Sequence, residues 1–278
     1  MIILFRLLAL LPLPVLHAVG VLVGWLSFGL SPTYRRRFRD NAIQAGYRPA
    51  SLWRAVAESG KLVAEVPRLW FGRPVPVEWA AEDLVASARQ QGRGIVFLTP
   101  HLGCFEVTAQ AYAARHGRIT VLYRPARKPW LRNMVDRART RDNLRAVPTT
   151  LAGVRDLLRA LKAGEAVGLL PDQVPPQGQG VWAPFFGKPA YTMTLSTRLA
   201  RQSGALLVLA WGERLSWGRG YRIHLRRWPS DVAPEPQAAA GQVNAAMEAL
   251  IRECPDQYLW GYARYKAPPA EQSVAMKA

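Results

Sequence analysis

The sequence predicts an α/β fold: a mostly parallel sheet flanked by helices on both faces, with an N-terminal membrane-anchoring helix. Short apolar segments of strand type alternate with amphipathic helical segments along most of the 278 residues. This alternation favours parallel strands joined by helices. A long apolar segment comes first, and neither an internal repeat nor a linker between soluble domains follows. We therefore expect an anchor over residues 1–34 and one large domain over residues 35–278.

The anchor is the first predicted element. Residues 7–30 carry no formal charge, and a bilayer-spanning helix needs about 20 apolar residues. The segment is longer than a signal-peptide core, and TYRRRFRD follows in place of a cleavage site. The positive-inside rule then puts the rest of the chain in the cytoplasm. Pro12 and Pro14 leave open a kinked helix lying partly in the membrane interface, and a buried soluble helix is the remaining alternative.

The elements of the first half follow in order. Apolar residues at three- and four-residue spacing predict one or two helices over residues 41–70. FGRPVPVEW predicts a proline-rich bridge, and AAEDLVASARQQGRG predicts a helix that ends in glycine. The apolar segments GIVFLTP and ITVLYRP predict the first two strands. Residues 129–142 have a helical pattern.

The second half continues the alternation. TLAGVRDLLRALKAGE predicts a helix capped by Thr149 or Thr150, and AVGLLPDQ predicts a third buried strand. Residues 174–191 contain too much Pro and Gly for regular structure, so a loop is expected. YTMTLSTRLARQSG predicts a helix and ALLVLAWGE a fourth strand. GYRIHLRRW alternates apolar and basic residues, which favours an edge strand, and residues 236–254 predict a last amphipathic helix.

Charge points to an anionic partner. The formal net charge is +18, and 31 of the 37 basic residues are Arg, which binds phosphate and carboxylate in a bidentate manner. Nucleic acid, anionic lipid or an acidic carrier protein would each fit. The two cysteines do not suggest a disulfide framework or a zinc site, and we expect no metal or cofactor. GxGxxG, GxxxxGK[ST] and HExxH motifs are absent from the sequence, which argues against dinucleotide, P-loop and zincin chemistry.

The segment LTPHLGCFEV carries the candidate chemistry at an expected strand-to-helix junction. His101 and Glu106 lie five residues apart, so they would not share a face if both were helical. Glu106 can reach the ring only if His101 precedes the helix, and the pair would then act as a general base and its orienting acid. The pair has no protein nucleophile of its own, which suits direct acyl transfer to a substrate hydroxyl. A packed histidine beside a surface acid is the alternative, and Cys104 is interpreted as a packed small residue.

Several segments together resemble a known family. They are RRRFRDN after the anchor, HLGCFE, VLYRP, PDQ, FFGKPAYT and the late QYLWGYARYK. In this order and spacing they resemble the late acyltransferases of lipid A biosynthesis, the lauroyl/myristoyl transferases, within the H-x4-[DE] glycerolipid acyltransferases. The resemblance covers nearly the whole chain and makes residues 35–278 an expected acyltransferase domain.

The resemblance also implies roles for particular residues. It makes His101 the general base and Glu106 its partner. It implies that Arg124 binds substrate or stabilises the oxyanion, and that Asp172 and Gln173 form an acidic turn near the site. Phe186 and Gly187 would then form a wall of the acyl channel. Two structural alternatives stay open. Arg124 would also fit the role of a surface cation, and Asp172 would also fit the role of a residue that caps a turn.

The expected function is that of a membrane-bound O-acyltransferase. It would transfer a fatty acyl chain from acyl carrier protein to a hydroxyl of a lipid A precursor, an anionic glycolipid, on the cytoplasmic face of a bacterial inner membrane. One alternative keeps the chemistry but uses another glycolipid or aminolipid acceptor, or acyl-CoA as donor. A membrane-anchored nucleic-acid-binding or scaffold protein is the alternative of another class, although the sequence shows no known nucleic-acid motif, and we expect no nucleic-acid partner.

Overall fold

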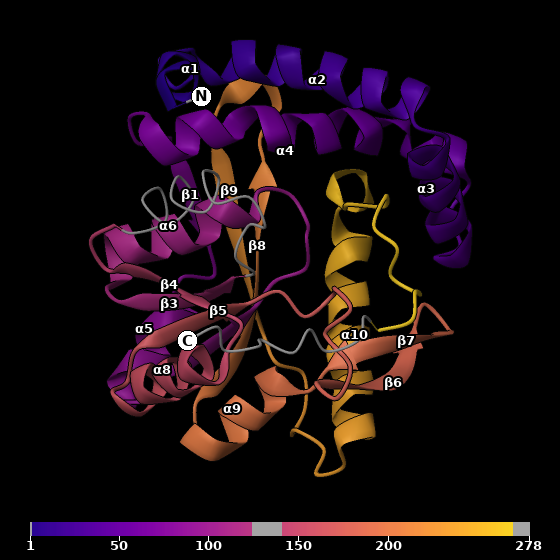
Figure 1. Cartoon of the computed structure of the whole chain (residues 1–278). Coiled ribbons are helices and arrows are strands. Elements are labelled where there is room, and N and C mark those ends of the chain that lie inside the picture. The colour runs from indigo at the N-terminus through magenta and orange to yellow at the C-terminus, as the bar shows by residue number, and fades with distance from the viewer. Residues whose placement is uncertain (1, 124–140, 269–278) are drawn as a thin grey trace, which may run out of the picture.

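A seven-stranded sheet forms the centre of the protein in the computed structural model, which describes residues 2–123 and 141–268 (Figure 1). The strand order is β1-β9-β8-β2-β5-β3-β4, and every pairing is parallel except that of β8 with β9. The predicted mostly parallel α/β sheet is therefore confirmed. The strands are β1 (Val77–Ala80), β2 (Ile95–Leu98), β3 (Ile119–Tyr123), β4 (Leu144–Pro148), β5 (Ala166–Leu169), β8 (Leu206–Arg214) and β9 (Tyr221–Arg227).

Helices cover both faces of this sheet, because its central strands are apolar on both sides. In β2, Val96 and Leu98 pack with the residues of α8, α9 and α10, whereas Ile95 and Phe97 pack with those of α5 and α6. The helices around the sheet are α5 (Asp83–Gln90), α6 (Phe105–His116), α8 (Leu151–Lys162), α9 (Leu195–Ser203) and α10 (Pro236–Glu253). Thr150 caps α8 by accepting a hydrogen bond from the backbone N–H of Gly153, as predicted.

The N-terminal helices form a further layer across one end of the molecule (Figure 1). Helices α1 (Ile2–Leu8) and α2 (Leu13–Leu30) lie over α4 (Trp53–Phe71), and α3 (Pro32–Gln44) turns away from them. A short 3-10 helix, Pro49–Leu52, leads into α4. By length and composition α2 is apolar enough to cross a membrane, as some core helices and signal sequences also are. It is thus a candidate membrane anchor.

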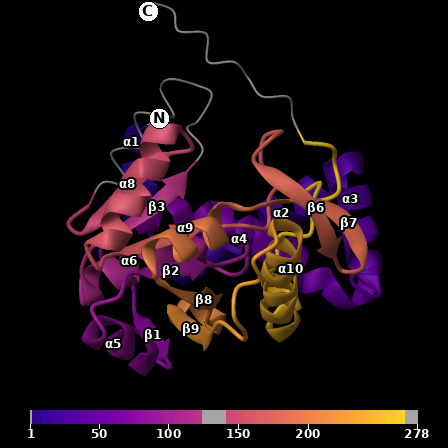
Figure 2. The ribbon, with the colours of Figure 1, turned by 90° about the horizontal axis from the view of Figure 1, so that it is seen from below.

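The prediction of a loop at residues 174–191 was wrong. Most of this segment forms an antiparallel hairpin of β6 (Gly180–Phe185) and β7 (Lys188–Met193). Phe186 and Gly187 make its two-residue turn, and both have positive φ angles, which is typical of the tight turns that join antiparallel strands. The hairpin lies against α10, on the other side of the molecule from α5 (Figure 2).

The prediction of the edge strand was wrong, and both strands at the edges of the sheet were missed. The segment predicted as an edge strand became β9, which lies between β1 and β8. The edge is β1, which pairs with β9 from within the segment expected to be a bridge. Strand β4, at the other edge, was not predicted. The helix expected at residues 129–142 falls almost wholly outside the described residues.

Candidate active site

The candidate motif lies where β2 ends and α6 begins. His101 is in the connecting loop, and α6 starts at Phe105, so His101 precedes the helix as the geometric argument required. Two contacts fix the loop: the N–H of Leu259 donates to the His101 carbonyl at 3.1 Å, and the N–H of Cys104 donates to the Gly212 carbonyl at 2.8 Å. A Cβ added at Gly103 would collide with the Gly212 carbonyl oxygen. Strand β8 therefore fills the space beside Gly103 and leaves none for a substrate there.

Two side chains from the end of β5 hold the ring of His101. Nδ1 of His101 lies 2.7 Å from Oδ1 of Asp172, and the backbone N–H of His101 donates to Oδ2 at 2.8 Å. Nε2 lies 3.0 Å from Nε2 of Gln173. An ionised carboxylate only accepts hydrogen bonds, so the proton of a neutral ring belongs on Nδ1. The lone pair of Nε2 then faces the Gln173 amide, and this nitrogen is the basic one.

The Asp172 carboxylate is almost completely buried, yet it stays ionised. Burial raises its pKa, but the charge and hydrogen bonds of His101, together with the charge of Arg264, lower the pKa below its ordinary value. Arg264 is itself buried and is held by the carbonyl of Tyr191 and the hydroxyl of Thr192, both at 2.7 Å. His101 is therefore oriented by a carboxylate that keeps its charge.

A small apolar pocket lies between α6 and the sheet, separated from His101 by the ring of Phe105. The ring of Phe105, which lines this pocket, is 4.9 Å from the ring of His101 between centroids. From there the pocket extends inward beneath α6. The residues that line it include Phe97, Thr99, Ala109, Tyr112, Gly168 and Ile223. A basic nitrogen close to an apolar pocket suits the activation of a hydroxyl next to a hydrocarbon chain.

Sequence comparison agrees with this chemistry. The family model described as bacterial lipid A biosynthesis acyltransferase matches residues 1–267. The chain belongs to this family.

Three members of the family are 26–30% identical to the chain over the aligned residues. It is 30% identical to a lipid A biosynthesis lauroyltransferase of Escherichia coli, over 66% of this chain and 60% of that protein. It is 27% identical to a palmitoleoyltransferase of the same organism, over 87% of this chain and 77% of that protein. A lipid A biosynthesis acyltransferase of Haemophilus influenzae is 26% identical, over 96% of this chain and 89% of that protein. The family membership and these relatives together identify the chain as an acyltransferase of the lipid A biosynthesis family.

In this acyltransferase, Glu106 lies in the first turn of α6. Its carboxylate accepts a hydrogen bond from the indole N–H of Trp70 at 3.4 Å. The hydrogen bonds given above for the His101 ring are with Asp172 and Gln173, not with Glu106. The assignment of Glu106 as the partner of His101 therefore stays a prediction.

The remaining predicted site residues fall in different places. Arg124 lies outside the described residues. Phe186 is buried in the hairpin turn, where its N–H donates to Oε1 of Glu248 at 2.7 Å and its ring lies 4.8 Å from the Arg252 guanidinium carbon. Gly187 follows it at the tip of the turn. The proposed acyl-channel role of this turn is likewise untested.

Cys104 is an unsuitable nucleophile in this acyltransferase. It is fully buried, and burial raises the pKa of its thiol well above the ordinary value. This agrees with its interpretation as a packed small residue. Among residues 2–123 and 141–268, no group of three or more His, Cys, Asp and Glu side chains could hold a metal ion.

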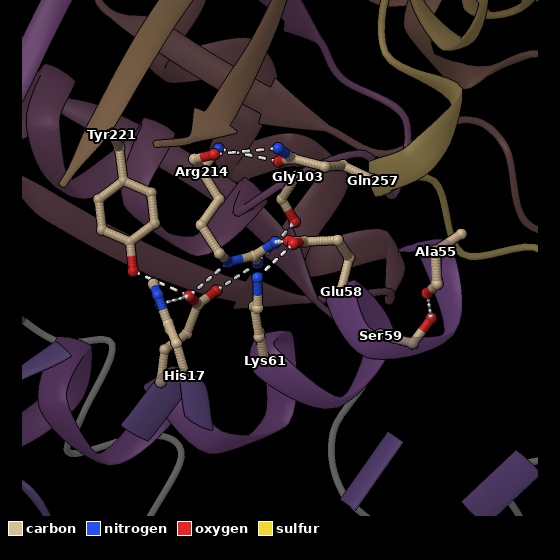
Figure 3. A network of polar contacts seen from close by, with 10 residues as sticks. His17, Ala55, Glu58, Ser59, Lys61, Gly103, Arg214, Tyr221 and Gln257 are labelled. Atoms are coloured by element: carbon tan, nitrogen blue, oxygen red, sulfur yellow. Dashed lines mark hydrogen bonds and ion pairs between the residues drawn. The ribbon is translucent and has the colours of Figure 1, made fainter. Parts of the chain in front are cut away.

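Sequence reasoning missed a buried ionic cluster close to the motif (Figure 3). Arg214 donates from Nη2 to Glu65 and from Nη1 to Glu58, both at 2.6 Å, and also contacts the Gly103 carbonyl at 3.3 Å. His17 of α2 lies 3.1 Å from Glu65. Burial raises the pKa of Glu65, but Arg214 and His17 lower it to about 2. A sequence signal did exist, since the two glutamates lie seven residues apart on one side of an amphipathic helix.

Proposed function

We propose that this acyltransferase moves a fatty acyl chain from acyl carrier protein to a hydroxyl of a lipid A precursor. The observation that carries the proposal is the hydrogen bond between Nδ1 of His101 and the buried Asp172 carboxylate, which leaves Nε2 as the base. Family membership and the adjacent apolar pocket support the substrate class. We place the reaction at the cytoplasmic face of a bacterial inner membrane, where the anionic leaflet would attract the arginines that follow the apolar helix α2.

In the proposed mechanism, Nε2 of His101 takes the proton of the acceptor hydroxyl, which displaces the amide of Gln173. The hydroxyl oxygen attacks the thioester carbonyl carbon, and a tetrahedral intermediate forms. The carbon–sulfur bond then breaks, the ester is complete, and the departing thiolate takes the proton from the imidazolium. Asp172 stabilises the imidazolium between these two proton transfers.

Other groups have proposed supporting roles. Glu106 would add a second negative charge near the imidazolium, in keeping with the H-x4-E pattern, and Arg124 would bind substrate or the oxyanion. The first backbone N–H groups of α6 would favour the developing oxyanion. The apolar pocket beneath α6 would take the acyl chain. The turn at Phe186 and Gly187 packs on the opposite face of the sheet, so it would border the chain only outside this pocket.

The net charge of +18 supports the proposed partners. Acyl carrier protein is a strongly acidic donor, and a lipid A precursor carries phosphates that arginine binds well. Donor and acceptor are tested together by offering the purified full-length chain acyl carrier protein thioesters or acyl-CoA. Each donor is combined with a lipid A precursor, another glycolipid or an aminolipid. Mass spectrometry of the products identifies the pair that reacts, and a preference for acyl-CoA or for another acceptor would contradict the proposal.

A further inference from the structure

Helix α2 has two different faces, although it is apolar along its whole length. One face is buried against α4 and consists of Leu13, Leu16, His17, Gly20 and Gly24. The opposite face is also apolar but is exposed, and Leu22, Leu26 and Leu30 are 65%, 61% and 81% exposed. An apolar face of this length that protein leaves uncovered indicates a partner.

Because α2 is packed on α4, it could not cross a bilayer by itself in this structure. The two helices lie side by side for much of their length (Figure 1), and the glycines at positions 20, 24 and 60 allow their backbones to touch. His17 joins the buried ionic cluster through Glu65 (Figure 3). A helix crossing the bilayer in this arrangement would carry α4 with it, and α4 contains five charged residues: Arg54, Glu58, Lys61, Glu65 and Arg68. Charged residues at the bilayer centre are costly.

The exposed apolar surface continues beyond α2. Leu7 and Leu10 precede it and are 58% and 75% exposed. Trp217, in the turn between β8 and β9, is 89% exposed, and the next residue, Gly218, lies against Pro14 at the start of α2. We call these exposed side chains the docking face, represented by Leu7, Leu10, Leu22, Leu26, Leu30 and Trp217. Tryptophan is typical of the boundary between membrane and water.

Positive charge adjoins one end of the docking face. Arg36, Arg37 and Arg39 on α3 are exposed, and Arg35 donates to the last carbonyls of α2, with 2.8 Å to that of Phe28. An apolar helix face flanked by arginines matches the surface of a bilayer that contains anionic phospholipids. A second protein copy would not account for this charge.

We propose that α1 and α2 lie flat in one leaflet of an anionic bilayer, with the docking face immersed and α4 above it. The cluster at Arg214 then connects the immersed layer to the Gly103 carbonyl, two residues from His101. The active site would thus lie directly above the lipid that presents the acceptor. This inference rests on the proposed membrane setting and not on the acyl-transfer chemistry.

Depth measurements test this orientation on the full-length chain. Leu10, Leu22 and Leu30 are replaced by Cys one at a time and labelled with a fluorophore in vesicles of phosphatidylethanolamine and phosphatidylglycerol. The native cysteines react slowly, since Cys104 is fully buried and burial raises the pKa of Cys254 to about 12. Lipids with nitroxides at shallow and deep acyl positions then quench each label. A flat helix predicts equal, shallow depths at the three positions. A deep label at Leu22 between two shallow ones would overturn the proposal.

A binding experiment tests the chemistry of the partner. Leu22→Asp should lower partitioning into these vesicles by more than about tenfold, because an apolar side chain is lost from the membrane and a charge replaces it. Leu151→Asp is the matched control, since Leu151 is 79% exposed on α8, away from the docking face, and its change should leave partitioning unaltered. Equal loss in both variants, or a Leu22→Asp change that dissociates an oligomer and leaves vesicle binding intact, would contradict the proposal. Activity of each variant toward detergent-dispersed substrate shows separately whether acyl transfer persists.

Discussion

Asp172 is the residue that most changes the interpretation of the motif. The sequence predicted His101 and the acidic turn at Asp172 and Gln173 separately, but not their contact. That contact depends on β2 and β5 being neighbours in the sheet, with Leu98 opposite Leu169. Both side chains therefore follow the carboxyl ends of adjacent strands, which is where sites form in such sheets. Strand order is a property of the whole chain, so local patterns could not supply this pairing.

Asp172→Asn tests the orienting role. The amide keeps the size of the side chain but removes its charge, so Nδ1 loses a partner that stabilises the imidazolium. We expect kcat to fall about 10²- to 10⁴-fold, the range of general base catalysis, while the circular dichroism spectrum stays unchanged. Glu106→Gln, measured beside it, reports the contribution of the second carboxylate. A folded Asp172→Asn variant with near-normal kcat would remove Asp172 from the mechanism.

Ala109→Phe tests the pocket as the acyl site. Ala109 lines the pocket from α6, so a phenyl ring there would fill part of its space. The variant should lose activity toward long acyl chains by more than about tenfold, and toward short chains by less, since each excluded methylene forfeits about 0.8 kcal/mol. Ala114→Phe, at an exposed position of the same helix, is the matched control. An equal loss for all chain lengths would argue against acyl binding in this pocket.

Elements with a strong local pattern were predicted best. The apolar strands β2, β5 and β8 and the helices α8 and α10 follow their sequence patterns closely. The hairpin of β6 and β7 was missed because its Pro and Gly content matched a loop. It is stabilised from outside, since Asn244 of α10 donates to the Pro184 carbonyl at 2.9 Å and Tyr265 to the Phe185 carbonyl at 3.0 Å. Tertiary contacts of this kind override local preference.

The ionic cluster joins α2, α4 and β8 and makes stability depend on pH. The pKa of Glu65 is about 2 in the folded protein and near 4.5 when unfolded. A lowered pKa stabilises the fold above pH 4.5, and this contribution is lost as the pH falls toward 2. Glu65→Gln should lower the free energy of unfolding by about 3–5 kcal/mol at pH 7 and flatten its decline between pH 4.5 and 3.

Denaturant unfolding of the detergent-solubilised protein across this pH range measures both effects. Glu78→Gln is the control, because its exposed pair with Arg222 should contribute at most about 1 kcal/mol. An unchanged pH dependence in Glu65→Gln would show that the acid sensitivity arises elsewhere.

The whole molecule combines three parts with different tasks. The helices α1 and α2, which present an apolar surface, lie over α4 (Figure 1). Helix α4 carries buried charges, and the sheet positions His101 and Asp172 at its carboxyl edge. The sequence predicted the apolar segment but left its orientation open. The packing of the helices favours a flat orientation of α2 over a membrane-spanning one, because α2 shares a charged cluster with α4. The composition of the sequence does not show that α2 and α4 pack together.

The most direct test of the account is acyl transfer by His101→Ala. The purified full-length chain is mixed with acyl carrier protein thioester and a lipid A precursor, and the acylated product is quantified by mass spectrometry. We predict that the variant folds with an unchanged circular dichroism spectrum and loses at least about 10²-fold in turnover, because no other group takes the hydroxyl proton. A folded His101→Ala variant that turns over at a near-normal rate would contradict the central claim.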